Sequence, residues 1–495
     1  SGTRIPARRY PAETGGDSLT DLLLILLSVA GIWGMGLTVT LVLLTPIFRS
    51  TQTQSSLTEL LGLGLVFGFG STAFFYFLWG WIGFAYTSIV AWSWMGVGLL
   101  LGAGSLLMRF RVSQKISNET EASSAEDDFK KLCLAIVLFL GLTTLIQSLM
   151  TPQRFWDERA IFGLKSIVLF QEGTLQNEAL LHPDFVQYHP KYPLLIPLNE
   201  THLYLLLGEV NDRWSKIMFP LLYLGMVLCF QGVLQRTTRQ PARAWIFTLM
   251  LATVPSMVPW EYGFLSGQGD GPVACFHTIT LLYLWSYLTE AQKAEPDPAV
   301  LKMLPLIAGL SAGMTIFTKD EGIAFFLIDL IAISIVCLLY FRDRLLSLAF
   351  NAGKFGLTTV LLVTPWLLYR KHLPVTTEMT YFSRMQITNL TEGLAALQWA
   401  VTHLLQCMFL EAWSWGLQWW AFVISLFAYP GRAFRPHQLF LLFNLAGALS
   451  ALIIAGMIAP TPVQEHIGGS SLRFLLQISG GAILFIAGQW MEDLE

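Results

Sequence analysis

The stretch that decides the fold is LCLAIVLFLGLTTLIQSLM (Leu132–Met150), which is followed at once by TPQRFWDERAIFGLK (Thr151–Lys165). The first segment carries no charge and is close to the ~20 apolar residues that a helix needs to cross a bilayer. The second segment concentrates charged side chains directly behind it. Because charge is costly at membrane depth, such a cluster at the edge of a span indicates either a membrane anchor or a functional site.

The composition of the whole chain is that of a membrane protein. Of its 495 residues, 54% are hydrophobic and 13% are charged, whereas soluble domains carry roughly 25% charged residues. Apolar runs recur along the chain and together predict about thirteen membrane spans. They lie near residues 22–46, 58–80, 84–108, 132–150, 215–235, 244–262, 272–289, 303–317, 322–341, 354–369, 412–428, 437–457 and 474–490. We therefore expect an all-α polytopic membrane protein.

Polar segments divide this membrane protein into parts. Stretches 193–208 and 394–409 are shorter or more polar than a span, and they predict helices that lie along the membrane interface. The predicted division is a polar tail (1–20), three N-terminal spans (21–108), a polar linker (109–131) and a membrane domain (132–495) whose first external loop covers 151–197.

Charge and cysteine content exclude several classes of partner. The net charge of −3 and the lack of a Lys/Arg tract argue against nucleic-acid binding. The five Cys residues stand singly in apolar segments without CxxC spacing. This pattern predicts small core side chains rather than a disulfide framework or a thiolate metal site.

Short basic loops predict the orientation of the spans after residue 132. Cytoplasmic loops are enriched in Lys and Arg, which assigns four loops to the inside: 236–243, 289–302, 342–344 and 431–437. The intervening loops then share the outer face: 151–191, 260–271, 319–321, 370–392 and 461–473. Every acidic or unusual motif of this part of the chain falls on that outer face, although the assignment rests on the basic loops alone. Three spans before an inside linker put the N-terminus outside, yet the tail carries Arg4, Arg8 and Arg9. Either one N-terminal segment does not cross the membrane, or charge bias is a poor guide there.

Acidic residues in two outer loops are candidates for catalysis. Asp157 and Glu158 open the first loop, where either could instead serve only as the N-terminal cap of a helix at 159–170. Asp270 stands in GQGDGP, and a tight turn would also explain that motif.

Basic residues accompany these acids on the same face. TKDEG places Lys319 and Glu321 between two apolar runs, either as a functional pair or as a salt-bridged turn in the headgroup region. Arg370 follows PWLLY, which indicates an anionic partner such as a phosphate, or snorkelling to lipid headgroups. His466 and Arg473 stand in EHIGGSSLRFLLQ, where a buried ion pair between helices is the alternative to a binding role.

In their order along the chain, these motifs resemble those of bacterial integral-membrane glycosyltransferases of the GT-C fold, in the group related to dolichyl-phosphate-mannose–protein mannosyltransferases and lipid A aminoarabinose transferases. The resemblance runs from Leu132 to the end of the chain and rests on FWDERAIFGLKSIVLF, HPKYPLLIPL, GQGDGP, TKDEG and SSLRFLLQ. It implies an inverting enzyme of the bacterial cytoplasmic membrane. Such an enzyme transfers a sugar from a polyprenyl-phosphate donor to a protein, lipid or glycan acceptor on the periplasmic side.

The resemblance also implies roles for the candidate residues. The acid of the first outer loop acts as general base, which here is Asp157 or its neighbour Glu158, where the group often has a smaller residue. Asp270 is a second acidic contact to the acceptor or the sugar. The remaining candidates bind the donor phosphate or shape its site: Lys319, Glu321, Arg370, Arg473, His189, Tyr192 and His466. Some GT-C enzymes need a divalent metal, so the three acidic residues are also candidate ligands of Mg²⁺ or Mn²⁺.

Three other functions fit parts of the pattern. A transporter or lipid flippase would line a pathway with intramembrane charges, but the two halves of the chain show no matching hydropathy repeat. An O-antigen ligase or polymerase would use a large late loop, whereas the largest outer loop here comes first, at 151–191. A non-catalytic scaffold would use that loop only to bind a partner. The sequence favours the glycosyltransferase.

Overall fold

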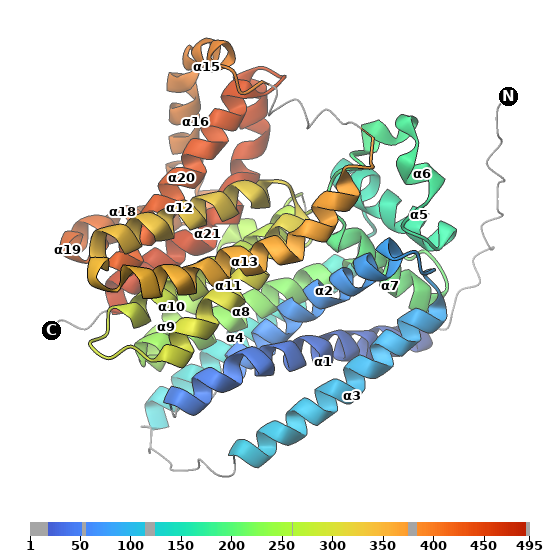
Figure 1. Cartoon of the computed structure of the whole chain (residues 1–495), viewed down its shortest axis with the longest axis horizontal. Helices are drawn as coiled ribbons and strands as arrows, with labels where there is room; N and C mark the ends of the chain where they lie inside the picture. The colour runs from blue at the N-terminus through green and yellow to red at the C-terminus, as the bar shows by residue number, and fades with distance from the viewer. Residues whose placement is uncertain (1–17, 52–55, 114–123, 260, 375–383, 492–495) are drawn as a thin grey trace.

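The computed structural model describes residues 18–51, 56–113, 124–259, 261–374 and 384–491, and within these ranges every regular element is helical (Figure 1). Ten helices of the described chain are long and apolar enough to cross a membrane. They are α1 (Ser18–Thr51), α2 (Leu57–Trp81), α3 (Ser88–Ser113), α4 (Ser124–Leu149), α8 (Met218–Thr238), α11 (Pro298–Thr318), α12 (Glu321–Tyr340), α13 (Leu345–Arg370), α20 (Pro436–Ile458) and α21 (Val463–Met491). The prediction of an all-α polytopic membrane protein is confirmed.

The centre of the helical bundle is α10 (Asp270–Ala291), which corresponds to the predicted span at 272–289. Its 22 residues are long enough to cross a membrane, and its side chains are buried almost throughout. It packs against α8, α11, α20 and α21. Residue Asp270 at its first position is thereby held at one end of the bundle.

The predicted span at 244–262 is wrong. This segment begins with α9 (Pro241–Ala252), which has only 12 residues. The helix stops before the 3-10 turn Pro255–Met257, because Pro255 lacks the backbone N–H that would continue the helical ladder. A helix of this length falls short of the ~20 residues that cross a bilayer.

The predicted span at 412–428 is wrong for a similar reason. It is divided into α17 (Ala412–Trp415) and α18 (Gln418–Ala428). Between them Gly416 has a φ of 55°, which lies outside the right-handed helical region. The 11 residues of α18 are therefore too few for a complete crossing.

The first three spans pack directly on the later helices. α1 contacts α2, α3 and α11, and α2 contacts α8. A Cβ atom on Gly34 would lie 2.1 Å from the carbonyl oxygen of Gly98, so α1 and α3 approach as closely as they do because both positions lack side chains. Arg236 of α8 donates to the fully buried Glu59 of α2 at 3.0 Å.

Parts of two predicted segments lie outside the described residues, namely the polar tail up to residue 17 and linker residues 114–123. The rest of the linker is helical, because α3 continues to Ser113 and α4 begins at Ser124.

The two predicted interfacial helices differ in outcome. α7 (Leu195–Leu207) is buried at every position except its last, so the prediction is wrong there. Its polar side chains find partners inside the protein; for example, the ring of His202 bonds the hydroxyl of Tyr76 at 2.9 Å. α16 (Leu397–Phe409) does bury one face only, through Ala400, Leu404 and Cys407.

The first outer loop folds into short helices before α7. They are η1 (Asp157–Gly163), α5 (Leu164–Glu172), α6 (Glu178–Leu181) and η2 (Pro183–Tyr188). η1 is π-helical, a wide turn that often marks functional sites. In Figure 1, α5 and α6 lie beyond one end of the long helices.

Candidate active site

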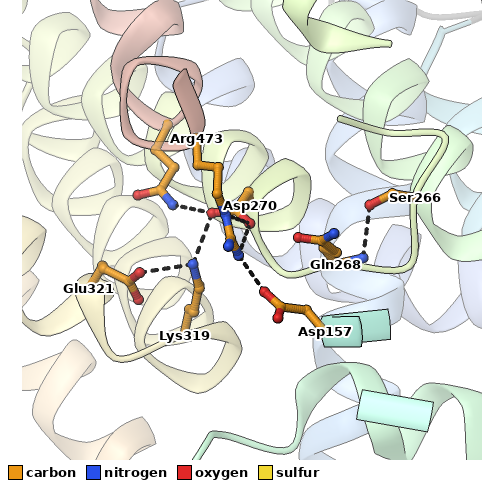
Figure 2. Close-up of polar contacts among 8 residues, drawn as sticks. Asp157, Ser266, Gln268, Asp270, Lys319, Glu321 and Arg473 are labelled. Atoms are coloured by element: carbon orange, nitrogen blue, oxygen red, sulfur yellow. Dashed lines mark hydrogen bonds and ion pairs between the residues drawn. The ribbon is translucent and has the colours of Figure 1, made fainter. Parts of the chain in front are cut away.

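Five of the predicted residues meet in one chain of alternating charges, which we call the charge network: Asp157, Arg473, Asp270, Lys319 and Glu321 (Figure 2). They come from η1, α21, the start of α10 and the short junction between α11 and α12. Most of these segments are far apart in sequence. Their contact confirms the prediction that the acidic and basic motifs share one face.

Arg473 joins the two aspartates. Its Nη2 lies 2.6 Å from Oδ2 of Asp157 and 2.8 Å from Oδ2 of Asp270. Its Nε also donates to Oδ2 of Asp270, at 3.0 Å. A planar guanidinium suits such multiple contacts, because its N–H groups point in fixed directions.

Asp270 is the central member of the charge network and is fully buried. Besides Arg473, its other oxygen accepts from Lys319 Nζ at 2.9 Å and from Gln477 Nε2 at 2.7 Å. Lys319 in turn lies 2.8 Å from Glu321. A buried carboxylate needs charged and hydrogen-bonded partners of this kind, since desolvation alone would make it very costly.

Asp157 is one of the two partly exposed ends of the charge network, the other being Glu321. Its side chain retains 22% of its accessible surface. Oδ2 accepts from Arg473, while Oδ1 has no hydrogen-bond partner among the described residues. A substrate group that reaches this end of the bundle can therefore bond Oδ1 without displacing a protein donor.

Glu158 is turned away from the charge network and is buried. Its carboxylate accepts from the backbone N–H groups of Arg154, Phe155 and Gly267, the last at 2.7 Å. It thus ties the start of the first outer loop to the glycine-rich turn before α10. Neither acid caps a helix at 159–170, because η1 begins without a side-chain cap; Glu158 holds the loop before it, while Asp157 faces the charge network.

A second, basic group lies beside the charge network. Arg370 forms a bidentate ion pair with Asp320, in which Nη1 donates to Oδ1 at 2.8 Å and Nη2 donates to Oδ2 at 2.7 Å. Burial, together with the nearby charge of Arg370, outweighs the opposing effect of Asp320 and lowers the pKa of Lys165 to about 7. Burial and the charge of Arg370 also lower the pKa of Lys191. Because Arg370 acts on both lysines, we refer to Arg370, Lys165 and Lys191 as the basic group.

Sequence reasoning missed Lys165 and Lys191, although both stand in motifs that carried the resemblance. Lys165 donates to the carbonyl oxygens of His189 and Tyr192, at 2.6 and 3.3 Å. It thereby fixes the turn at His189, a non-glycine residue with a φ of 51°. Burial raises the pKa of Tyr192, and the carboxylates of Glu321 and Asp320 act in the same direction. The Nζ of Lys165 lies 5.8 Å from the centre of the Tyr192 ring.

The remaining predicted residue is His466. It lies on α21, about two turns before Arg473, and packs near Gly456 of α20. Its binding role stays a prediction.

The three acidic residues do not form a metal centre. Asp157 and Asp270 contact Arg473, and Glu158 is occupied by backbone N–H groups. Within the described ranges, no group of three or more His, Cys, Asp or Glu side chains is arranged to hold a metal ion. We therefore derive no chemical step through a metal.

Comparisons with known proteins find a similarity to a solved structure. No protein-family model matches the chain, and no curated protein matches it. Among solved structures, the chain is similar to the crystal structure of ArnT from Cupriavidus metallidurans bound to undecaprenyl phosphate. The TM-score is 0.44 and the sequence identity is 16%. The match covers 71% of this chain and 59% of that chain, which is less than two thirds of its length.

Proposed function

We propose that this protein is a GT-C-type glycosyltransferase that moves a sugar from a polyprenyl-phosphate donor to an acceptor on the extracytoplasmic side of the membrane. The observation that carries the proposal is the partly exposed side chain of Asp157 at one end of the charge network, whose Oδ1 has no hydrogen-bond partner among the described residues. The order of the sequence motifs supports the same assignment.

Asp157 acts as the general base. An acceptor hydroxyl that bonds Oδ1 passes its proton to this carboxylate while its oxygen attacks the anomeric carbon of the donor sugar. Arg473 holds the carboxylate through Oδ2 and so orients the free oxygen. Glu158 cannot do this without giving up three backbone N–H groups that have no other charged acceptor in the site.

The basic group receives the leaving phosphate. As the bond between the anomeric carbon and the phosphate oxygen breaks, its electron pair and negative charge pass to the polyprenyl phosphate. Cations that are already in place stabilise this developing charge without reorganising. Arg370 and Lys191 supply that charge. Attack from the side of Asp157 and departure toward the basic group together give inversion.

The test uses the full-length protein in lipid vesicles with several undecaprenyl-phosphate sugars and an extract of cell-envelope lipids as acceptor. Wild-type protein is expected to form a labelled product, and Asp157→Asn is expected to form none. Glu172→Gln, at the exposed end of α5, is the matched control and should behave as wild type. Movement of labelled donor across the membrane without transfer, equal in wild type and Asp157→Asn, would contradict the proposal and support a flippase.

A further inference from the structure

Glu200 is a buried carboxyl group that neither the charge network nor the basic group includes. It lies on α7 and has no accessible surface. One carboxyl oxygen, Oε1, accepts from Nε2 of Gln153 at 2.7 Å. The other, Oε2, contacts the hydroxyl of Ser166. These two contacts must suit either the ionised or the protonated form of the Glu200 carboxyl group.

The number of available hydrogens favours the protonated form of Glu200. The hydroxyl of Ser166 contacts both Oε2 of Glu200 and the carbonyl oxygen of Phe162, the latter at 3.0 Å. A hydroxyl has one hydrogen, and a carbonyl oxygen can only accept. Both contacts are satisfied together if Glu200 donates its proton to Ser166, and Ser166 donates to Phe162.

The charges around Glu200 favour the same state. Among the described residues, no Lys, Arg or His side chain forms an ion pair with Glu200. Its charged neighbours are carboxylates, Glu158 on η1 and Asp212 in the segment before η3 (Trp214–Ile217). Lys216 on η3 donates elsewhere, to Thr151 and to a backbone carbonyl.

The two partners of Glu200 flank the π-helix that carries Asp157. Gln153 precedes η1, and Ser166 follows it in α5. Gln153 also fills the space beside Gly163, where an added Cβ would lie 2.3 Å from its side-chain oxygen. Glu200 therefore bridges the two ends of η1 from α7, a helix that is buried inside the protein.

We propose that Glu200 is a positioning residue whose neutral carboxyl group, by bridging Gln153 and Ser166, holds η1 in the form that directs Asp157 toward its substrate. Transfer is lost when Glu200 releases its proton. The link to transfer rests on the proposed function, whereas the bridge across η1 does not.

The direction of the pH effect follows from the surroundings. Burial, together with Glu158 and Asp212, outweighs the hydrogen bonds of Ser166 and Gln153 and raises the pKa of Glu200 to about 8. The group is therefore neutral below about pH 8. Above that pH the neutral fraction falls about tenfold for each pH unit. The ionised carboxylate can no longer donate to Ser166, and it repels Glu158.

The experiment compares wild type, Glu200→Gln and the control Glu172→Gln as full-length proteins in lipid nanodiscs. The first readout is amide hydrogen exchange of residues 153–166, expressed as protection relative to the free peptide at each pH. It needs no substrate. The second readout is transfer from undecaprenyl-phosphate sugars over the same pH range.

In wild type and the control, both protection and transfer are expected to fall as pH rises through about 8. Glu200→Gln is expected to lack the transition near pH 8 in both readouts, because a glutamine amide can accept from Gln153 and donate to Ser166 at every pH. Ser166→Ala cuts one end of the bridge, so its protection should be low on both sides of that pH. If Glu200→Gln does not fold, Ser166→Ala still tests whether the bridge holds η1.

Two results separate the possible failures. Equal pH profiles in wild type and Glu200→Gln, in both readouts, would overturn the role of Glu200. A wild-type transition in exchange that Glu200→Gln lacks, with no transfer by any variant, would support the bridge and contradict the proposed function.

Discussion

Lys319 and Glu321 offer a direct test of how burial controls the energetics of the charge network. The two residues form one ion pair at 2.8 Å, and Lys319 makes a second pair with Asp270 at 2.9 Å. The side chain of Lys319 is 6% exposed and that of Glu321 is 34% exposed. Two substitutions, Lys319→Met and Glu321→Gln, therefore break the same contact from its buried and its exposed end.

The structure predicts unequal costs. Lys319→Met leaves the fully buried Asp270 with one cation instead of two, and removing one partner from a buried pair costs about 3–5 kcal/mol. Glu321→Gln removes only a partly exposed pair, which is worth at most about 1 kcal/mol, and Lys319 keeps Asp270.

The free energy of unfolding is measured for both variants by titration with a denaturing detergent in mixed micelles. We expect Lys319→Met to lose at least three times as much as Glu321→Gln. Equal losses, or a loss below about 1 kcal/mol for Lys319→Met, would refute the argument that burial of Asp270 makes Lys319 necessary.

Three further predictions concern the site. Asp157→Asn should abolish transfer and lower the free energy of unfolding by at most about 1 kcal/mol. Glu158→Gln should lower it by about 1–3 kcal/mol, because three backbone N–H groups lose a charged acceptor. Unfolding titrations and transfer assays on both variants check this. Arg370→Gln should weaken binding of undecaprenyl phosphate by about 10- to 100-fold, the equivalent of one charge-assisted contact. Equilibrium binding measurements check this. The control is Arg342→Gln on the exposed turn η5 (Arg342–Arg344), which should leave the affinity unchanged. Lys165 loses its positive charge as pH rises through about 7. Binding of undecaprenyl phosphate to the wild type should therefore weaken over that pH range. The same pH dependence of binding in Lys165→Met would contradict this.

Much of the fold could be predicted from the sequence because the bilayer imposes simple rules. Apolar length predicted the helices, and basic loops predicted that Asp157, Asp270 and Arg473 would share one face. Their contacts confirm this. The predictions at 244–262 and 412–428 failed because a proline and a positive-φ glycine end helices inside apolar runs. Hydropathy does not detect such breaks.

The sequence by itself determined that the chain is a helical membrane protein, that its unusual charges gather at one end, and which residue types are available there. These follow from the local cost of placing charge and backbone polar groups in lipid. Only the tertiary structure decided which charges pair and which carboxylate stays free. Asp157 and Glu158 are adjacent in sequence, yet the π-helix directs one toward Arg473 and the other toward backbone N–H groups. The bridge of Glu200 likewise depends on packing between segments that are distant in sequence, and no local pattern encodes it.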